Sequence, residues 1–333
     1  MNEMPKLTVS SSPHIRSSQN IASIMRDVVI ALVPAMAVAV AMFGLSALLV
    51  LVVSVAASVF FEWGYRKLMK KSCTIGDYSA VVTGVLLACC LPAGVPLWLP
   101  VIGAFFAIVV VKQLYGGIGK NFVNPALAAR AFLFSWPVIM TTWVAPNFTY
   151  GADVVTSATP MSFLHLSKLP EGISVMGTFL GTIGGSMGEI SALALIIGGA
   201  YLVWRKVITL RIPASYILTV AVITFIFPRG NDNLQWMLYN LFSGGLMLGA
   251  IFMATDYATS PITSKGQIVY GIGCGLLTVF IRYFGGYVEG VSYAILIMNV
   301  CVWLIDRYTM PRRFGVTKED IQKAKAAKKE AAK

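Results

Sequence analysis

The residues best suited to unusual chemistry form one short polar run, residues 153–160, with the sequence Asp-Val-Val-Thr-Ser-Ala-Thr-Pro. The run places a carboxylate and three hydroxyl side chains among small residues and ends in a proline. A threonine hydroxyl is a poor nucleophile, so a covalent bond at Thr159 would need a separate modifying enzyme. If Thr159 carries a cofactor, the chain is a redox protein. If Thr159 or Ser157 only caps a short helix in a surface loop, the run carries no chemistry.

Two other polar segments lie beside prolines. Residues 116–125 read Gly-Gly-Ile-Gly-Lys-Asn-Phe-Val-Asn-Pro, and residues 255–261 read Thr-Asp-Tyr-Ala-Thr-Ser-Pro. Asn124 can cap a helix that begins at Pro125. The amides of Asn121 and Asn124 can also bind a ligand, because an amide both donates and accepts hydrogen bonds. Asp256 is a candidate for ion coordination or backbone anchoring, and the alternative is a cap on the next helix or its preceding turn.

The composition indicates which elements position these residues. Of 333 residues, 57% are hydrophobic and only 12% are charged, about half the charged fraction of an ordinary soluble domain. Apolar stretches near the roughly 17–25 residues of a membrane helix recur between polar breaks. We therefore expect an all-α polytopic membrane protein without a removable signal peptide. The ten expected spans are residues 27–44, 47–65, 78–91, 97–111, 125–144, 189–204, 212–227, 234–254, 267–285 and 291–305.

Lysine and arginine are unevenly distributed between the connections, which predicts the orientation. Residues 1–26 and the basic tail 307–333 are expected in the cytoplasm, on either side of one membrane domain, residues 27–306. The outer segment 145–188 then carries the polar run on the extracytoplasmic side. This arrangement explains the net charge of +12 by contact with anionic lipid rather than nucleic acid.

The ten spans divide into five before the outer segment and five after it. Each half contains one of the two polar, proline-containing connections on its inner side. Corresponding breaks in two halves are typical of internally repeated transporter folds, whose site lies at the repeat interface. The sequence therefore predicts two pseudo-repeated halves with a site between them.

The polar run resembles the flavinylation motif Asp-x-x-(Ser/Thr)-(Gly/small)-Ala-Thr of the membrane subunits of Rnf-type electron-transport complexes and Na+-translocating NADH:quinone reductases. Ser157 stands where glycine is usual, and Pro160 makes the run more similar to the Rnf member of the family than to its quinone-reductase counterpart. Residues 116–132 and 249–261 also resemble this family, in the same order along the chain. The likeness extends over most of the sequence.

The resemblance implies specific site residues. Thr159 would carry FMN through a phosphoester made by a dedicated flavin transferase, and Asp153 and Thr156 would belong to the transferase's recognition pattern. Asn121 and Asn124 would lie at a second, non-covalent flavin, riboflavin, near the cytoplasmic side. Arg130, which the sequence places one turn inside the fifth span, is expected to snorkel toward lipid phosphate or a flavin.

The family also implies a fold and an activity. We expect a urea-transporter-like bundle in a bacterial or archaeal cell membrane, in a complex with the Rnf subunits A, B, C, E and G. Such complexes couple electron transfer between ferredoxin and NAD+ to Na+ or H+ movement. Two other hypotheses stay open: a permease or channel for a small polar solute, which would be colourless, and a scaffold that holds redox subunits without flavin. No metal site is expected from two histidines and five dispersed cysteines.

Overall fold

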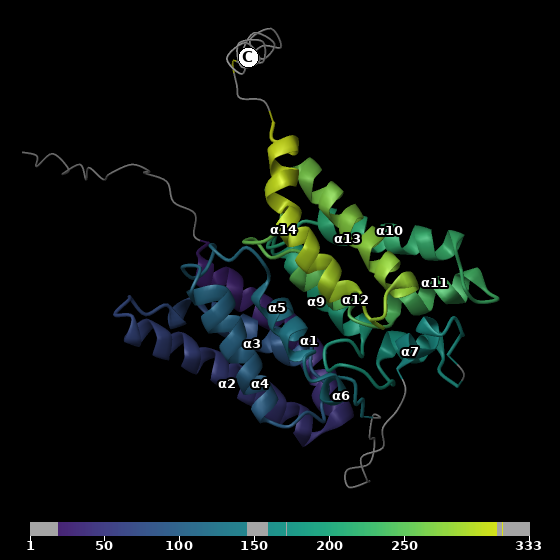
Figure 1. Ribbon diagram of the computed structural model, residues 1–333, viewed down its shortest axis with the longest axis horizontal. Coiled ribbons are helices and arrows are strands. Elements are labelled where there is room, and N and C mark those ends of the chain that lie inside the picture. Colours follow the sequence, from purple (N-terminus) through teal and green to yellow (C-terminus); the bar gives the residue numbers. More distant parts are fainter. Residues whose placement is uncertain (1–18, 145–158, 171, 312–314, 316–333) are drawn as a thin grey trace, which may run out of the picture.

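The computed structural model describes residues 19–144, 159–170, 172–311 and 315. These residues are helical or irregular, without a strand, and one isolated antiparallel bridge joins Pro92 to Ser186. The expected all-α class is therefore confirmed over the described ranges. In Figure 1 the purple and blue helices of the first part of the chain gather on one side, and the green and yellow helices gather on the other.

The helices of the first part precede residue 145. They are α1 (Ile21–Phe43), α2 (Leu45–Leu68), the 3-10 turn η1 (Ile75–Asp77), α3 (Ser79–Cys89), α4 (Trp98–Phe105), the π-helix η2 (Phe106–Gln113), α5 (Pro125–Leu133) and α6 (Pro137–Met140). Helix α4 continues directly into η2. A π-helix inserted in an α-helix is uncommon and frequently occurs at functional sites.

The helices of the second part follow residue 159. They are α7 (Pro160–His165), α8 (Val175–Leu180), α9 (Ala192–Trp204), α10 (Arg211–Ile226), α11 (Asn233–Phe242), α12 (Leu246–Leu248), the π-helix η3 (Gly249–Met253), α13 (Ser264–Phe284) and α14 (Val291–Thr309). Both π-helices directly precede the polar connections noted in the sequence.

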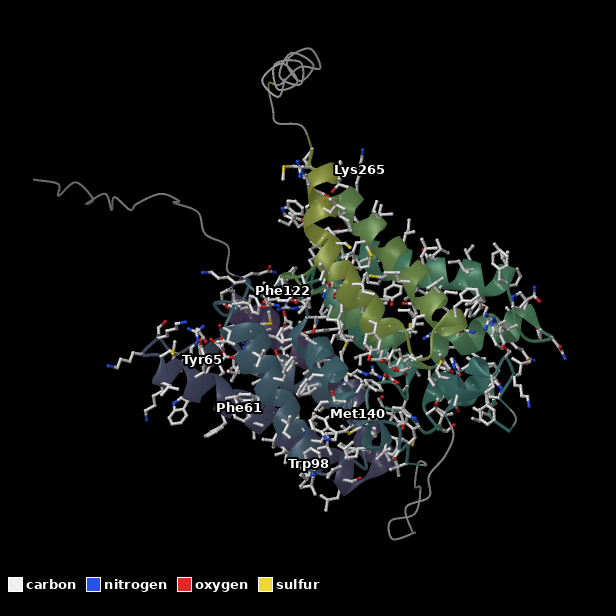
Figure 2. The ribbon with its side chains drawn as sticks, viewed as in Figure 1. Phe61, Tyr65, Trp98, Phe122, Met140 and Lys265 are labelled. Atoms are coloured by element: carbon white, nitrogen blue, oxygen red, sulfur yellow. The ribbon has the colours of Figure 1, made fainter. Side chains whose placement is uncertain are left out.

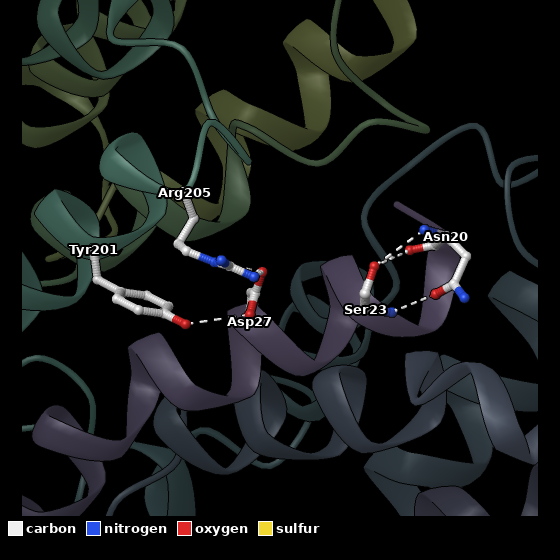
Figure 3. A network of polar contacts seen from close by, with 5 residues as sticks. All are labelled: Asn20, Ser23, Asp27, Tyr201 and Arg205. Carbon is white, nitrogen blue, oxygen red and sulfur yellow. Dashed lines mark hydrogen bonds and ion pairs between the residues drawn. The ribbon is translucent and has the colours of Figure 1, made fainter. Parts of the chain in front are cut away.

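Helix α1 is fixed at its first turn and against α9. Asn20 and Ser23 form a reciprocal capping box, in which the Ser23 N–H donates to Asn20 Oδ1 at 2.8 Å. Asp27 accepts hydrogen bonds from Tyr201 of α9 and from Arg205, which directly follows that helix, each at 3.2 Å (Figure 3). These contacts join the first helix of one part to the first long helix of the other.

The lengths of the helices support a multi-pass membrane protein but not the full count of ten spans. Within the described ranges, four helices can cross a membrane by length and composition, α1, α2, α13 and α14, and a fifth candidate is the bent pair formed by α11 with α12–η3. Four shorter apolar helices of the same ranges, α3, α4–η2, α9 and α10, contain 10–17 residues. The ten-span count and the boundaries of the membrane domain stay predictions.

Two of the expected spans are interrupted. The predicted helix over residues 125–144 is wrong, because α5 ends at Leu133 and α6 begins only at Pro137. Residues that precede a proline avoid the helical conformation, which explains the break at Trp136. In the expected span 234–254, the chain bends by 60° between α11 and α12. Such breaks are tolerated at membrane depth only against protein or a water-lined cavity.

The two parts of the chain contain similar contacts. Helix α2 packs against α3 and α4, while α10 packs against α11 and α13, and α1 packs against α9 across the two parts. Glycines on α13 allow its close approach to α10: a Cβ at Gly275 would lie 2.7 Å from Thr219 Cβ. A buried core of apolar residues extends over α1, α3, α9, α10, η3 and α13, so both parts share it.

The connections lie at opposite ends of the bundle. In Figure 2, Phe122 in the η2–α5 connection and Lys265 at the start of α13 lie toward the upper part of the view. Trp98 at the start of α4 and Met140 at the end of α6 lie toward the lower part. The two polar, proline-containing connections are therefore separated from the helices that flank the outer segment.

Candidate functional site

A cavity of about 100 Å³ lies where the two polar connections meet. Its walls come from α1, α3, α5, η3 and the α9–α10 connection. The polar residues that line it are Ser79, Thr83, Lys112, Asn121, Asn124, Thr255 and Asp256. The segments 116–125 and 255–261 thus come together, and three of the expected site residues share one cavity.

Asn124 caps α5 and also lines the cavity. Its Oδ1 accepts hydrogen bonds from the N–H groups of Ala126 at 3.0 Å and Leu127 at 3.3 Å, and Pro125 is the first helical residue. Its Nδ2 donates to the Met253 carbonyl at 3.2 Å, across to η3. The capping role is confirmed, and the same side chain ties the two parts of the chain together.

Asn121 is buried, with 6% of its surface exposed, yet its amide is used only in part. Its Nδ2 donates to the Val123 carbonyl at 3.2 Å. Its Oδ1 accepts no hydrogen bond from any residue that the structure describes. Because the residue lines the cavity, this oxygen can accept a hydrogen bond from a ligand.

Asp256 belongs to the connection between η3 and α13. Its carboxylate accepts hydrogen bonds from the Thr259 hydroxyl at 3.1 Å and the Ala258 N–H at 3.5 Å. It therefore caps its own turn, whereas Thr263 caps α13. Burial raises the pKa of the Asp256 carboxyl, and the Thr259 and Ala258 hydrogen bonds and the Lys112 charge oppose that rise.

A buried ion pair stands at the cavity wall. The Lys112 Nζ, near the end of η2, lies 2.6 Å from Glu62 Oε2 on α2 and 2.6 Å from Ser79 Oγ on α3. Only 3% of Lys112 and 1% of Glu62 is exposed. The Glu62 carboxylate also accepts a hydrogen bond from Thr74 at 2.7 Å. Lys112 is thus a buried, paired charge rather than a solvated one.

Arg130 lies outside this cavity, and the expectation that it snorkels to lipid is wrong. Its guanidinium is 3% exposed and is paired with two carboxylates. Nη1 lies 3.0 Å from Glu189, just before α9, and Nη2 donates to Glu289, just before α14. The guanidinium is thus paired inside the protein with a buried carboxylate and a part-buried one, and it does not face lipid. Flavin contact by Arg130 stays a prediction without a supporting contact.

Thr159 stands at the N-cap position of α7, before Pro160. Its side chain makes no capping hydrogen bond, so the expected helix-capping role of Thr159 is wrong. The residue is 8% exposed. Its carbonyl accepts a hydrogen bond from the Ser162 hydroxyl at 2.6 Å. Asp153, Thr156 and Ser157 lie outside the described residues.

Sequence reasoning missed Lys112, Glu62 and Ser79 as residues of the cavity and its wall. A signal was available, since Glu62 is a lone carboxylate within the apolar span 47–65 and Lys112 directly follows the span 97–111. Ionisable residues within membrane segments are functional candidates by default. Their pairing could not be found, because 50 residues separate them in the chain.

The cavity combines apolar walls with polar groups. Val28, Leu86 and Phe252 supply apolar walls, while an ammonium, amides and a carboxylate supply donors and acceptors. The part of the chain that the structure describes has no group of three His, Cys, Asp or Glu side chains able to hold a metal ion. The donors and acceptors that line the cavity can bind and orient an organic ligand through hydrogen bonds.

Comparison with known proteins points to one family. The model of the "NQR2, RnfD, RnfE family" matches residues 8–315. The chain is 53% identical to the D subunit of the Na+-translocating ferredoxin:NAD+ oxidoreductase complex of Acetobacterium woodii, over 96% of this chain and 98% of that protein. It is 44% identical to the D subunit of the proton-translocating ferredoxin:NAD+ oxidoreductase complex of Clostridium ljungdahlii, over 92% and 96%. The D subunit of an ion-translocating oxidoreductase complex of Actinobacillus succinogenes is 36% identical, over 94% and 98%.

Proposed function

Because this chain belongs to the NQR2, RnfD, RnfE family, we propose that it is a membrane subunit of an Rnf-type complex that couples ferredoxin:NAD+ electron transfer to ion movement. The observation that carries this proposal is the similarity to two such subunits over more than nine-tenths of both chains. The permease hypothesis is not supported by these relatives, which are named as oxidoreductase subunits. One relative is named as Na+-translocating and the other as proton-translocating, so neither ion is assigned.

In this proposal the chain carries one flavin on each side of the membrane. FMN is attached to Thr159 by a flavin transferase that reads Asp153 and Thr156, on the extracytoplasmic side. Riboflavin occupies the cavity at Asn121 and Asn124, on the cytoplasmic side. Flavins supply one- and two-electron chemistry, and the chain supplies their position and electrostatic surroundings. Electrons pass through this chain between the partner subunits A, B, C, E and G.

The cavity residues fit a flavin. The polar edge of its ring has several acceptors and one N–H donor, which suits a lining that offers Lys112 as donor, Asp256 as acceptor and the amide of Asn121 as either. Thr159 fits less directly, since the residue is only 8% exposed. Attachment of FMN therefore requires one of two conditions. Either Thr159 is modified before its side chain becomes buried in the folded protein, or the segment around Thr159 opens locally to admit the transferase.

The proposed fold has ten spans in two pseudo-repeated halves, as in urea transporters, with both termini in the cytoplasm. The corresponding packing of α2 with α3 and α4, and of α10 with α11 and α13, supports this arrangement. So does the position of the cavity, which draws residues from both parts of the chain.

The experiment that tests the flavin proposal compares wild type with Thr159→Ala, each produced with an active flavin transferase. After denaturing electrophoresis, we expect ultraviolet-excited fluorescence from wild type and none from the variant, because the phosphoester needs the Thr159 oxygen. Ser162→Ala is the matched control, since it removes a neighbouring hydroxyl and should keep its fluorescence. Fluorescence retained in Thr159→Ala would place the attachment elsewhere.

A further inference from the structure

Lys112 is the cation that lines the cavity. Its ammonium has three N–H donors. Two of them are used, by Glu62 Oε2 and Ser79 Oγ, each at 2.6 Å. The remaining N–H makes no hydrogen bond to a residue of the described ranges. Lys112 lines the cavity although only 3% of its surface is exposed.

The partners of Lys112 are arranged to fix its position. Glu62 comes from α2 and Ser79 is the first residue of α3, so the ammonium is held between two helices. Thr74 donates to the other oxygen of Glu62 at 2.7 Å, which orients the carboxylate. A buried ion pair is weak evidence of stabilisation, since an apolar pair of similar volume often serves the fold equally well.

From these contacts we infer that Lys112 is a flavin-binding residue of this cavity and that Glu62 and Ser79 are its positioning residues. The free N–H donates to a carbonyl oxygen or ring nitrogen on the polar edge of the flavin. The inference rests on the proposed riboflavin site and adds the group that controls its electrostatics. Asp256, Asn121 and Asn124 are among the other polar residues that share the cavity with Lys112.

A fixed positive charge beside the flavin has two measurable effects. It strengthens binding, because a hydrogen bond from a charged donor is stronger than one from a neutral donor. It also stabilises negative charge that reduction adds to the ligand, an effect that is large where water is excluded. Lys112 therefore raises the reduction potential of the bound flavin. The carboxylate of Glu62, which pairs with Lys112, and that of Asp256, which lines the cavity, oppose this effect in part.

The test removes both charges together. Lys112→Met alone would leave the Glu62 carboxylate buried without its partner and could prevent folding. The double variant Lys112→Met/Glu62→Gln is neutral and keeps an oxygen that can accept the Thr74 hydrogen bond. Lys112→Arg retains the positive charge. Lys265→Gln is the control, since it removes an exposed positive charge at the start of α13 that does not line the cavity.

Each full-length variant is purified with its partner subunits, and riboflavin binding is followed by fluorescence quenching. We expect the double variant to bind riboflavin about tenfold more weakly. A further tenfold loss of affinity for the reduced flavin would lower its two-electron reduction potential by about 30 mV. Lys112→Arg should restore most of the potential, and Lys265→Gln should leave affinity and potential unchanged.

Two results are decisive and separable. If wild type binds riboflavin and the double variant keeps its affinity and potential, Lys112 is only structural and the inference is overturned, while the proposed function stands. If wild type binds no riboflavin, the proposed cavity site itself fails. A double variant that does not fold is replaced by Lys112→Gln/Glu62→Gln, which is also neutral and keeps polar side chains at both positions. Weaker riboflavin binding and a lower potential in that variant support the inference, and an affinity and potential equal to those of wild type overturn it.

Discussion

At the residue scale, the two asparagines of the η2–α5 connection differ in how much of each side chain the fold uses. Asn124 accepts two backbone hydrogen bonds at the start of α5 and donates one to the Met253 carbonyl. Asn121 donates one hydrogen bond, to the Val123 carbonyl, and its amide oxygen remains available in the cavity. Asn124 therefore serves the fold first, and Asn121 is better placed to serve a ligand.

This difference predicts separable effects of two matched substitutions. Asn124→Ala should lower the free energy of unfolding by about 0.5–2 kcal/mol, the usual cost of losing an N-cap, and lower riboflavin content as a consequence. Asn121→Ala should leave the unfolding temperature in detergent nearly unchanged and still reduce riboflavin content. Thermal unfolding and acid-released flavin measure the two effects. If riboflavin content fell in each variant only in proportion to the loss of stability, Asn121 would have a purely structural role.

At the residue scale, the sequence predicted features that depend on adjacent residues, such as helix caps. It did not predict which charged side chains pair with each other. Asn124 followed by Pro125 indicates a capped helix start because both residues act on the adjacent turn. The pairs of Lys112 with Glu62 and of Arg130 with Glu289 join residues 50 and 159 positions apart. Such pairs depend on helix packing that no local pattern specifies. For that reason a lipid-facing Arg130 was a reasonable expectation from the sequence, and the structure contradicts it.

At the element scale, the break between α11 and α12 is the main departure from the simple span pattern. Arg282 of α13 donates to the Asn240 carbonyl at 2.6 Å and to the Ser243 carbonyl at 3.4 Å, which satisfies the C-terminal end of α11. Gly244 has a positive φ of 69°. A Cβ at Gly244 would lie 3.2 Å from Glu289 Oε1 and 3.3 Å from Arg282 Nη2. The bend thus depends on a glycine in contact with buried charges.

Gly244→Ala should therefore destabilise the chain. A non-glycine residue in the left-handed region costs about 1–2 kcal/mol, and the added methyl group also crowds Glu289 and Arg282. We expect a lower unfolding temperature in detergent with covalent flavin retained. Gly286→Ala is the control, because a Cβ added there would meet no atom within 4 Å and its φ is not positive. Equal unfolding temperatures for the two variants would show that the bend does not require glycine.

Hydrophobicity predicted where most helices lie and failed where turns interrupt them. The short α3 ends at Cys89, before Pro92, as the proline indicates. In residues 125–144 and 234–254, the apolar composition continues through the breaks before Pro137 and at Gly244. A window of apolar residues does not distinguish a straight span from a bent one. The backbone geometry at those residues determines whether a span is straight or bent, and that geometry depends on neighbouring helices.

At the scale of the whole molecule, the two parts of the chain meet at a polar cavity, and hydrogen bonds and ion pairs join them. The Asn124–Met253 hydrogen bond and the Asp27–Arg205 ion pair join the parts on the cavity side. The pairs of Arg130 with Glu189 and Glu289 join them near the α11–α12 break. These contacts place the cavity at the junction of the two parts, which is where we propose that riboflavin binds.

The measurement that tests the central claim most directly is the flavin content of the full chain, made with active flavin transferase and its partner subunits. The purified protein is precipitated with acid, and flavin is then quantified in the pellet and in the supernatant and identified by mass spectrometry. We expect about one FMN per chain in the pellet, on the peptide that contains Thr159, and about one riboflavin per chain in the supernatant. A pellet and a supernatant both free of flavin, with the transferase shown to be active on another substrate, would contradict the central claim.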